Sequence, residues 1–226
     1  MLAQCDFCKE FSGDTKNAFH RLYRDDLVGR VLVQSEHHAV IPSLGQIVEG
    51  YLLVVPLDHF RSLGELRGDV LDDFVFISDM VGRALKTLYG PYIFFEHGVR
   101  SEHAGGCGIS HAHLHAMPLS GAPDPLVALR TKFPHTKLGR MAEIGQESAG
   151  FPSYLLLQDS HGDLYLFDTG PLPSQYMRQV LADSLHETNW DWRKAGREER
   201  LLSTIRRLSE HFAAFPDLKQ HLDAPR

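Results

Sequence analysis

Apolar and polar residues alternate along the first half of the chain in a pattern that predicts strands around one long helix. Short apolar runs predict two strands about a polar turn within residues 30–42, and a third at 51–56, where the sequence reads YLLVVP. Between residues 69 and 89 the apolar positions recur at helical spacing. Asp69 is expected to cap the start of this helix, and Gly90-Pro91 to end it.

The second half of the chain predicts strands first and helices last. YIFF at 92–95 predicts a strand, and a glycine-rich loop then leads to a histidine-rich strand at 109–117. Residues 119–150 show little periodicity and are expected to form a linker or long loop. Beyond it the pattern predicts a hairpin of strands at 154–158 and 164–167, followed by helices near 174–186 and 196–213.

Because strands and helices are grouped rather than strictly alternating, the order of elements favours an α+β fold built on an antiparallel sheet with flanking helices. The chain of 226 residues suits one large domain or one domain with an appended subdomain. We expect a first domain at 1–118, the linker at 119–150, and a C-terminal extension at 151–226, formed by the hairpin and helices, that packs on the first domain.

The amino-acid composition limits the kinds of binding partner and the location that we expect for this protein. The formal net charge of −6 argues against binding of a nucleic acid polymer, which usually requires a basic stripe. The first residues, MLAQCDFCKE, resemble neither a signal peptide nor a membrane anchor. Three cysteines make a poor disulfide framework and suit a reducing compartment. We therefore expect a cytoplasmic protein with no membrane partner.

The chain's densest histidine cluster lies in GGCGISHAHLHAMPL, residues 105–119, where His111, His113 and His115 alternate with apolar residues. On an extended strand the outer two would lie about 13 Å apart at the backbone. Zinc binds imidazole nitrogen at only about 2.0 to 2.1 Å, so one ion cannot easily take all three. An ordinary polar face of a strand would explain the presence of a single histidine better than that of three. The glycines that precede them allow backbone N–H groups to approach an anion.

These residues resemble a known family. HAHLHAM followed by Pro118 is similar to the signature of the histidine triad (HIT) family. The upstream stretch EGYLLVVPLDHFRSL resembles the family's strand with its proline, histidine and following helix. YIFFEHG resembles the strand that leads to the family's phosphate loop. The resemblance covers roughly residues 1–118. It implies a HIT-like antiparallel sheet and a homodimer.

The resemblance implies a nucleotide hydrolase or nucleotidyltransferase in which His113 attacks the α-phosphorus and forms a covalent nucleotidyl-histidine. A neutral imidazole can make this attack near pH 7. His115 and Ser110 would assist, and the glycine loop would stabilise charge on the phosphate oxygens. The substrate would be a dinucleoside polyphosphate, a nucleotide-sugar or similar conjugate, or a phosphoramidate, and hydrolysis is favoured over transfer.

A zinc site is also indicated. Cys5 and Cys8 have the spacing of a zinc half-site. Zinc-bearing HIT proteins and the related galactose-1-phosphate uridylyltransferases are similar in combining two such cysteines with the histidine after the VVP strand and the first triad histidine, which implies His59 and His111 here. Four protein ligands leave no open position, so the ion would be structural.

The nucleotide contacts depart from the family's pattern. Ser43 stands near the place of an acidic ribose-binding residue, Tyr51 replaces a common histidine, and His97 replaces a common asparagine. Arg178 is a candidate forked donor for a second phosphate group. The full set expected to bind nucleotide or phosphate is Ser43, Leu44, Gly45, Gln46, His97, Gly106, Cys107, Gly108, Gln175 and Arg178.

Two alternatives remain open at this level. The chain could be a zinc-stabilised nucleotide-binding or interaction module without turnover, which the intact His113 and glycine loop disfavour. It could also be a metallohydrolase with a catalytic ion on the triad, which the strand spacing disfavours. The remaining histidine-rich positions, His37-His38, Glu102-His103 and His161, are expected to be exposed.

Overall fold

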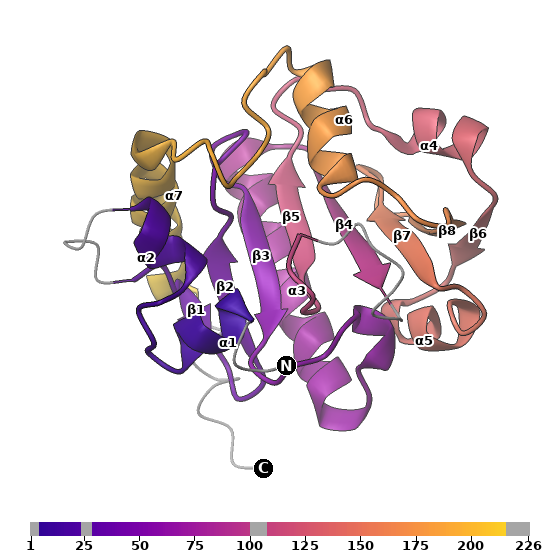
Figure 1. Ribbon diagram of the computed structural model, residues 1–226, viewed down its shortest axis with the longest axis horizontal. Coiled ribbons are helices and arrows are strands. Elements are labelled where there is room, and N and C mark those ends of the chain that lie inside the picture. Colours follow the sequence, from indigo (N-terminus) through magenta and orange to yellow (C-terminus); the bar gives the residue numbers. More distant parts are fainter. Residues whose placement is uncertain (1–4, 24–28, 100–107, 216–226) are drawn as a thin grey trace.

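The computed structural model describes residues 5–23, 29–99 and 108–215, and its centre is one antiparallel sheet. The strand order is β1-β2-β3-β5-β4-β7-β8-β6, so strands from both halves of the chain form a single sheet (Figure 1). This confirms the predicted α+β class. The strands are β1 (Val33–Gln34), β2 (His38–Pro42), β3 (Leu52–Pro56), β4 (Tyr92–Val99), β5 (Leu114–Pro118), β6 (His135–Leu138), β7 (Ser153–Gln158) and β8 (Leu164–Asp168).

Helices cover both faces of the sheet because its central strands are apolar on both sides. On one face the long helix α3 packs against β2 to β5, with α7 beside it; on the other, side chains of α1, α4 and α6 join the core (Figure 1). The helices are α1 (Asp6–Phe11), α2 (Ala18–Leu22), α3 (Gly68–Tyr89), α4 (Leu126–Lys132), α5 (Ile144–Glu147), α6 (Tyr176–Ser184) and α7 (Glu198–Ala213), with 3-10 turns η2 (Leu63–Glu65) and η3 (Met141–Glu143).

Helix α3 follows its sequence pattern closely. Its buried side chains include Phe74, Ile77, Val81 and Leu85, which recur at helical spacing and contact the sheet. The expected cap is wrong in detail: Asp69 lies in the first turn, where its charge suits the helix dipole, and Arg67 is the residue before the helix. Gly90 ends the helix at φ 85°, as predicted. None of the helices in the described ranges is long and apolar enough to cross a membrane.

Residues 119–150 are not the linker or long loop that their weak periodicity suggested. They contain α4, β6, η3 and α5, and β6 pairs with β8 at the edge of the sheet. The first three residues of β6 are exposed, because an edge strand of four residues needs little apolar side-chain burial when the backbone ladder holds it. A pattern search for hydrophobic alternation therefore misses this segment.

The prediction that His38 is exposed is wrong, because its side chain is fully buried. Its Nδ1 lies 2.8 Å from Oδ2 of Asp73 on α3, and the Ser35 hydroxyl donates to the same carboxylate oxygen at 2.5 Å. Local sequence could not show this, since the partner is 35 residues away. His37 is partly buried and His161 is exposed, while Glu102 and His103 lie outside the described residues.

Glu96 on β4 is buried on the α3 face and ties three elements together. Its carboxylate accepts the backbone N–H of Leu63 and the hydroxyl of Tyr154, each at 2.7 Å. Burial raises the pKa of Glu96 to about 8, against smaller opposing effects of these two hydrogen bonds.

We expect this carboxyl group to make the folded state less stable as the pH rises from about 5 to 8. Because the pKa is raised, the folded state holds the proton over a pH range in which the unfolded chain has lost it. The contribution of Glu96 to the stability of the folded state is therefore greatest at low pH and falls until the folded group ionises. Chemical denaturation at several pH values should show that Glu96→Gln is less pH-dependent than the parent over this window. Identical slopes would contradict the expectation.

Candidate functional site

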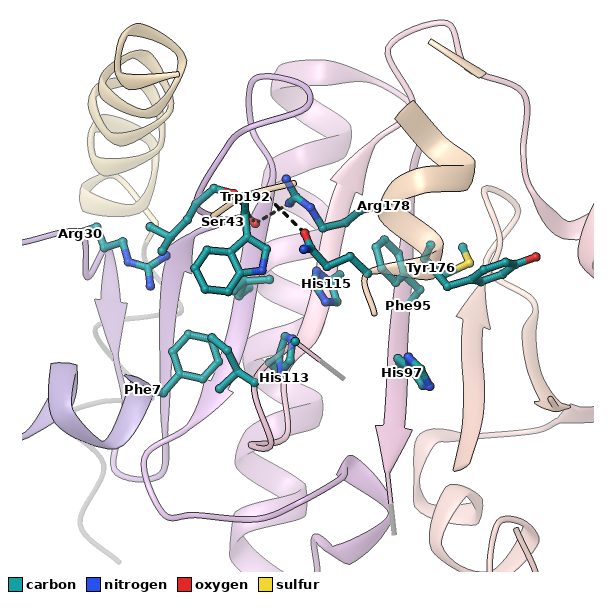
Figure 2. A pocket seen from close by; sticks show the side chains of 16 residues that line it. Phe7, Arg30, Ser43, Phe95, His97, His113, His115, Tyr176, Arg178 and Trp192 are labelled. Atoms are coloured by element: carbon teal, nitrogen blue, oxygen red, sulfur yellow. Dashed lines mark hydrogen bonds between the residues drawn. The ribbon is translucent and has the colours of Figure 1, made fainter. Parts of the chain in front are cut away.

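A cavity opens on the sheet face that α3 does not cover. It is formed by α1, residue 30, the loop after β2, strands β3, β4 and β5, the segment before β5, and the C-terminal residues from 175 to 192. Figure 2 shows Phe7 and Trp192 on one side of two triad histidines and Tyr176 on the other. The lining residues are Phe7, Arg30, Ser43, Leu44, Leu53, Phe95, His97, Gly108, Ile109, His113, His115, Gln175, Tyr176, Met177, Arg178 and Trp192.

The three histidines of the triad have different surroundings. Strand β5 begins only at Leu114, so His111 and His113 precede it rather than continue it, as the expected strand at 109–117 had them do. His113 and His115 both line the cavity, with ring centroids 4.7 Å apart. His111 is fully buried and its Nδ1 faces Cys5 and Cys8 instead.

The backbone determines which nitrogen of His113 is available for reaction. Nδ1 lies 2.6 Å from the carbonyl oxygen of His111, an acceptor that requires the Nδ1–H tautomer. Nε2 then keeps its lone pair. Burial lowers the pKa of His113, against a smaller opposing effect of that carbonyl, so the ring is neutral near pH 7. A neutral ring with a bare Nε2 in a cavity is equipped as a nucleophile.

His115 is held on two sides. Its ring stacks on Phe95 at 4.4 Å between centroids with an interplanar angle of 6°, and its Nδ1 lies 2.7 Å from the Tyr51 hydroxyl. Burial, followed by the charges of His113, Arg178 and His97, lowers the pKa of His115 well below its usual range. His115 is therefore neutral, with one nitrogen engaged by Tyr51.

His97 on β4 lines the same cavity. Burial lowers its pKa to about 4, with a smaller effect of His113. Its Nε2 is buried and meets no hydrogen-bond partner within the described part of the chain. A buried nitrogen without a partner is a costly arrangement that a bound ligand or water could relieve.

The cavity is suited to an anion. None of the described residues that line it is Asp or Glu. Arg178 on α6 is 3% exposed and has no carboxylate within ion-pair distance among the described residues. Arg30, the other lining arginine, is neutralised by Glu10, whose two oxygens lie 2.8 Å from its Nε and Nη2. A buried positive charge beside three imidazoles favours a negatively charged occupant.

Beside the cavity, the four residues predicted to hold zinc come together from distant parts of the chain. The ligand atoms of Cys5, Cys8, His59 and His111 all lie within 4.8 Å of one another. Cys5 Sγ and Cys8 Sγ lie 3.3 and 3.6 Å from His111 Nδ1, and Cys8 Sγ lies 3.3 Å from His59 Nδ1. Sulfur and nitrogen ligands on one tetrahedral zinc ion would be about 3.6 Å apart, so the spacing fits.

The orientation of His111 also fits a metal ligand. Its Nε2–H donates to the carbonyl oxygen of Pro56 at 2.9 Å, which leaves Nδ1 bare and directed at the thiols. Burial, with a smaller contribution from Cys5, raises the pKa of the Cys8 thiol to about 12. Only a cation of substantial charge would hold the Cys8 sulfur as a thiolate near pH 7.

The expected nucleotide contacts divide into three groups. Ser43, Leu44, His97, Gly108, Gln175 and Arg178 line the cavity, while Gly45 and Gln46 do not. Gly106 and Cys107 lie outside the described residues. Ser110, expected to assist catalysis, is exposed and is not among the lining residues that the structure describes.

Gly45 and Gln46 have structural contacts instead. Gly45 has φ 58°, and a Cβ atom there would lie 2.7 Å from the Trp192 backbone, so glycine allows the C-terminal segment to approach. The Gln46 amide donates to the carbonyl oxygens of Ser43 and Tyr51 at 2.9 and 2.7 Å and accepts from the Thr204 hydroxyl. These two residues hold the loop between β2 and β3 against the C-terminal segment.

Sequence reasoning missed the aromatic and basic lining residues that come from elsewhere in the chain. Phe7, which lies between the two cysteines of the CxxC pair, and Arg30 line the cavity, and neither was expected to bind nucleotide from the sequence. Tyr51 could have been noticed in the sequence, because it stands where the HIT family commonly has a histidine. Its contact with His115, 64 residues away, becomes visible only in the sheet.

The comparisons with known proteins gave structural neighbours only. No family model matches the chain, and no curated protein matches it. Solved structures of HIT family proteins are similar over about half of it. A HIT family protein from Bacillus anthracis has 22% identity and a TM-score of 0.39, covering 51% of this chain and 72% of its own. One from Bacillus subtilis has 22% identity and a TM-score of 0.40, covering 52% and 74%.

A Zn-bound histidine triad family protein from Mycobacterium smegmatis has 18% identity and a TM-score of 0.38, covering 52% of this chain and 76% of its own. These three solved structures are of HIT family proteins. The chemistry of the site rests on its own residues.

Proposed function

We propose that this protein is a nucleotide hydrolase that acts at the α-phosphate of a nucleotide conjugate through a covalent intermediate on His113, nucleotidyl transfer being the less favoured outcome. The observation that carries the proposal is the bare Nε2 of His113, oriented by the His111 carbonyl in a cavity whose described lining residues include no carboxylate. Phosphoryl groups are anionic, and such a cavity attracts them without repelling the attacking group.

Two displacements describe the reaction. In the first, the Nε2 lone pair forms a bond to the α-phosphorus while the bond to the leaving group breaks, and the leaving oxygen or nitrogen takes the electron pair. The ring becomes positively charged, and the His111 carbonyl oxygen stabilises it through Nδ1–H. In the second, water forms a P–O bond, the N–P bond breaks, and a proton passes to solvent. Splitting one displacement in two is the advantage of covalent catalysis.

Zinc would have a structural role in this scheme. Cys5, Cys8, His59 and His111 would hold the ion with no position left for substrate. It would join α1 to the segment before β5 and so fix the His111 carbonyl that orients His113. The chemistry that zinc supplies here is neutralisation of two thiolates, which stabilises the fold.

The covalent step predicts an adduct. We expect protein mixed briefly with nucleotide conjugates, including a dinucleoside polyphosphate, a nucleotide-sugar and a phosphoramidate, to gain the mass of one nucleotidyl group, which is a nucleoside monophosphate less one water. Intact-mass spectrometry after a neutral quench, followed by peptide mapping, should place it on His113. Turnover of a conjugate without any adduct on a histidine, in rapid-quench samples, would contradict the covalent route. Binding without turnover would favour the alternative of a nucleotide-binding module.

A further inference from the structure

Helix α6 contributes a buried arginine whose hydrogen bonds are directed at the protein. Arg178 donates from Nε to the carbonyl oxygen of Trp190 at 3.0 Å, from Nη1 to the Ser43 hydroxyl at 3.2 Å, and from Nη2 to the carbonyl oxygen of Gly45 at 2.6 Å. Three of its five N–H groups are thus engaged by groups of the fold. This differs from the forked phosphate donor that the sequence suggested, and it holds the guanidinium rigidly.

The held guanidinium lies over Tyr51. Arg178 Cζ is 5.3 Å from the centroid of the Tyr51 ring, and Tyr51 is fully buried. Burial raises the pKa of Tyr51 to about 12, while the charge of Arg178 and hydrogen bonding from Arg178 and Ser43 lower it. Tyr51 is therefore a phenol at neutral pH. Because a guanidinium has only N–H donors, Arg178 can only donate to the Tyr51 oxygen, which leaves the phenolic proton for His115 Nδ1, 2.7 Å away.

We propose that Arg178 and Tyr51 are positioning residues for His115: the guanidinium directs the Tyr51 hydroxyl to donate to His115 Nδ1, which fixes His115 as the Nε2–H tautomer. His115 then presents a hydrogen-bond donor to the cavity beside the nucleophile His113. With the opposite tautomer it would present a lone pair, which repels a phosphate oxygen. Through Arg178, the C-terminal segment thereby determines which nitrogen of His115 on β5 carries the proton.

The effect expected on turnover rests on the proposed function. The tautomer of His115 does not, because it can be measured without substrate. Long-range ¹H–¹⁵N spectra of histidine-labelled protein distinguish the two tautomers by their nitrogen shifts, and His115→Gln identifies the signals. We expect the Nε2–H form in the parent protein, and a mixture of tautomers in Tyr51→Phe and in Arg178→Met. Arg178→Lys, which keeps the charge, should lie between parent and Arg178→Met.

The matched control is Tyr154→Phe. Tyr154 is equally buried, but its hydroxyl donates to Glu96 on the opposite face of the sheet. The Tyr154→Phe variant should be less stable than the parent without changing the His115 signals. This outcome separates positioning of His115 from general loosening of the core. Where a substrate is found, Tyr51→Phe should lower kcat about 10- to 100-fold with little change in KM, the order expected when a donor is misplaced.

An unchanged His115 tautomer in folded Tyr51→Phe would overturn the proposal. A shift in Tyr51→Phe with none in Arg178→Met or Arg178→Lys would remove Arg178 from it. If Arg178→Met does not fold, Arg178→Lys and Tyr51→Phe still decide, since both keep most of the buried volume. A parent protein with neither adduct nor turnover would refute the proposed function and leave these spectra interpretable.

Discussion

Replacing His113 with alanine is expected to abolish turnover, lowering kcat/KM about 10⁴-fold or more, the order seen when an enzyme loses its covalent nucleophile. The expected loss is this large because we assign the attacking ring nitrogen to His113, whose Nδ1 is held by the His111 carbonyl and whose ring lies beside that of His115. The side chain is only partly buried, and its hydrogen bond to His111 is local. We therefore expect the fold to survive.

Steady-state kinetics, adduct mass and thermal denaturation should be measured together on this variant. His161→Ala is the matched control, since His161 is exposed in the turn between β7 and β8. The control should keep both turnover and adduct. Retained turnover in folded His113→Ala, with the adduct lost or moved to another residue, would reject His113 as the nucleophile.

Replacing Cys8 with serine is expected to release zinc and strongly destabilise the protein. Loss of a ligand present at a thousandfold excess over its Kd removes about 4 kcal/mol from the free energy of unfolding. For a chain of this size that corresponds to a fall in Tm of roughly 8 to 16 °C. The expected effect is large because the site joins α1 to the segments after β3 and before β5.

Elemental analysis of protein purified without chelators, combined with calorimetry, checks this expectation. Cys107→Ser is the control, because Cys107 is the third cysteine of the chain and is outside the proposed ligand set. It should retain one zinc ion per chain. Parent protein without zinc, or Cys8→Ser with unchanged zinc content and Tm, would refute the structural metal site.

Much of the architecture could be predicted because it depends on local periodicity. The buried positions of α3, including Phe74 and Leu85, and the hairpin about Gly162 follow from spacing and turn chemistry. Residues 119–150 were misread because β6 is a short edge strand whose stability comes from backbone pairing with β8. Such pairing leaves little trace in the pattern of side chains.

The sequence by itself determined which groups are proposed to carry the chemistry: an alternating histidine run, a CxxC pair and a histidine after a strand are short patterns whose spacing matches what a metal or phosphorus requires. Only the tertiary structure decided how each group is used. Sheet pairing places Tyr51 and Phe95 against His115, and α6 brings Arg178 from 127 positions further along the chain than Tyr51. The tautomer of a histidine depends on hydrogen-bond partners within about 3 Å, and for His115 the chain brings those partners close only when it folds.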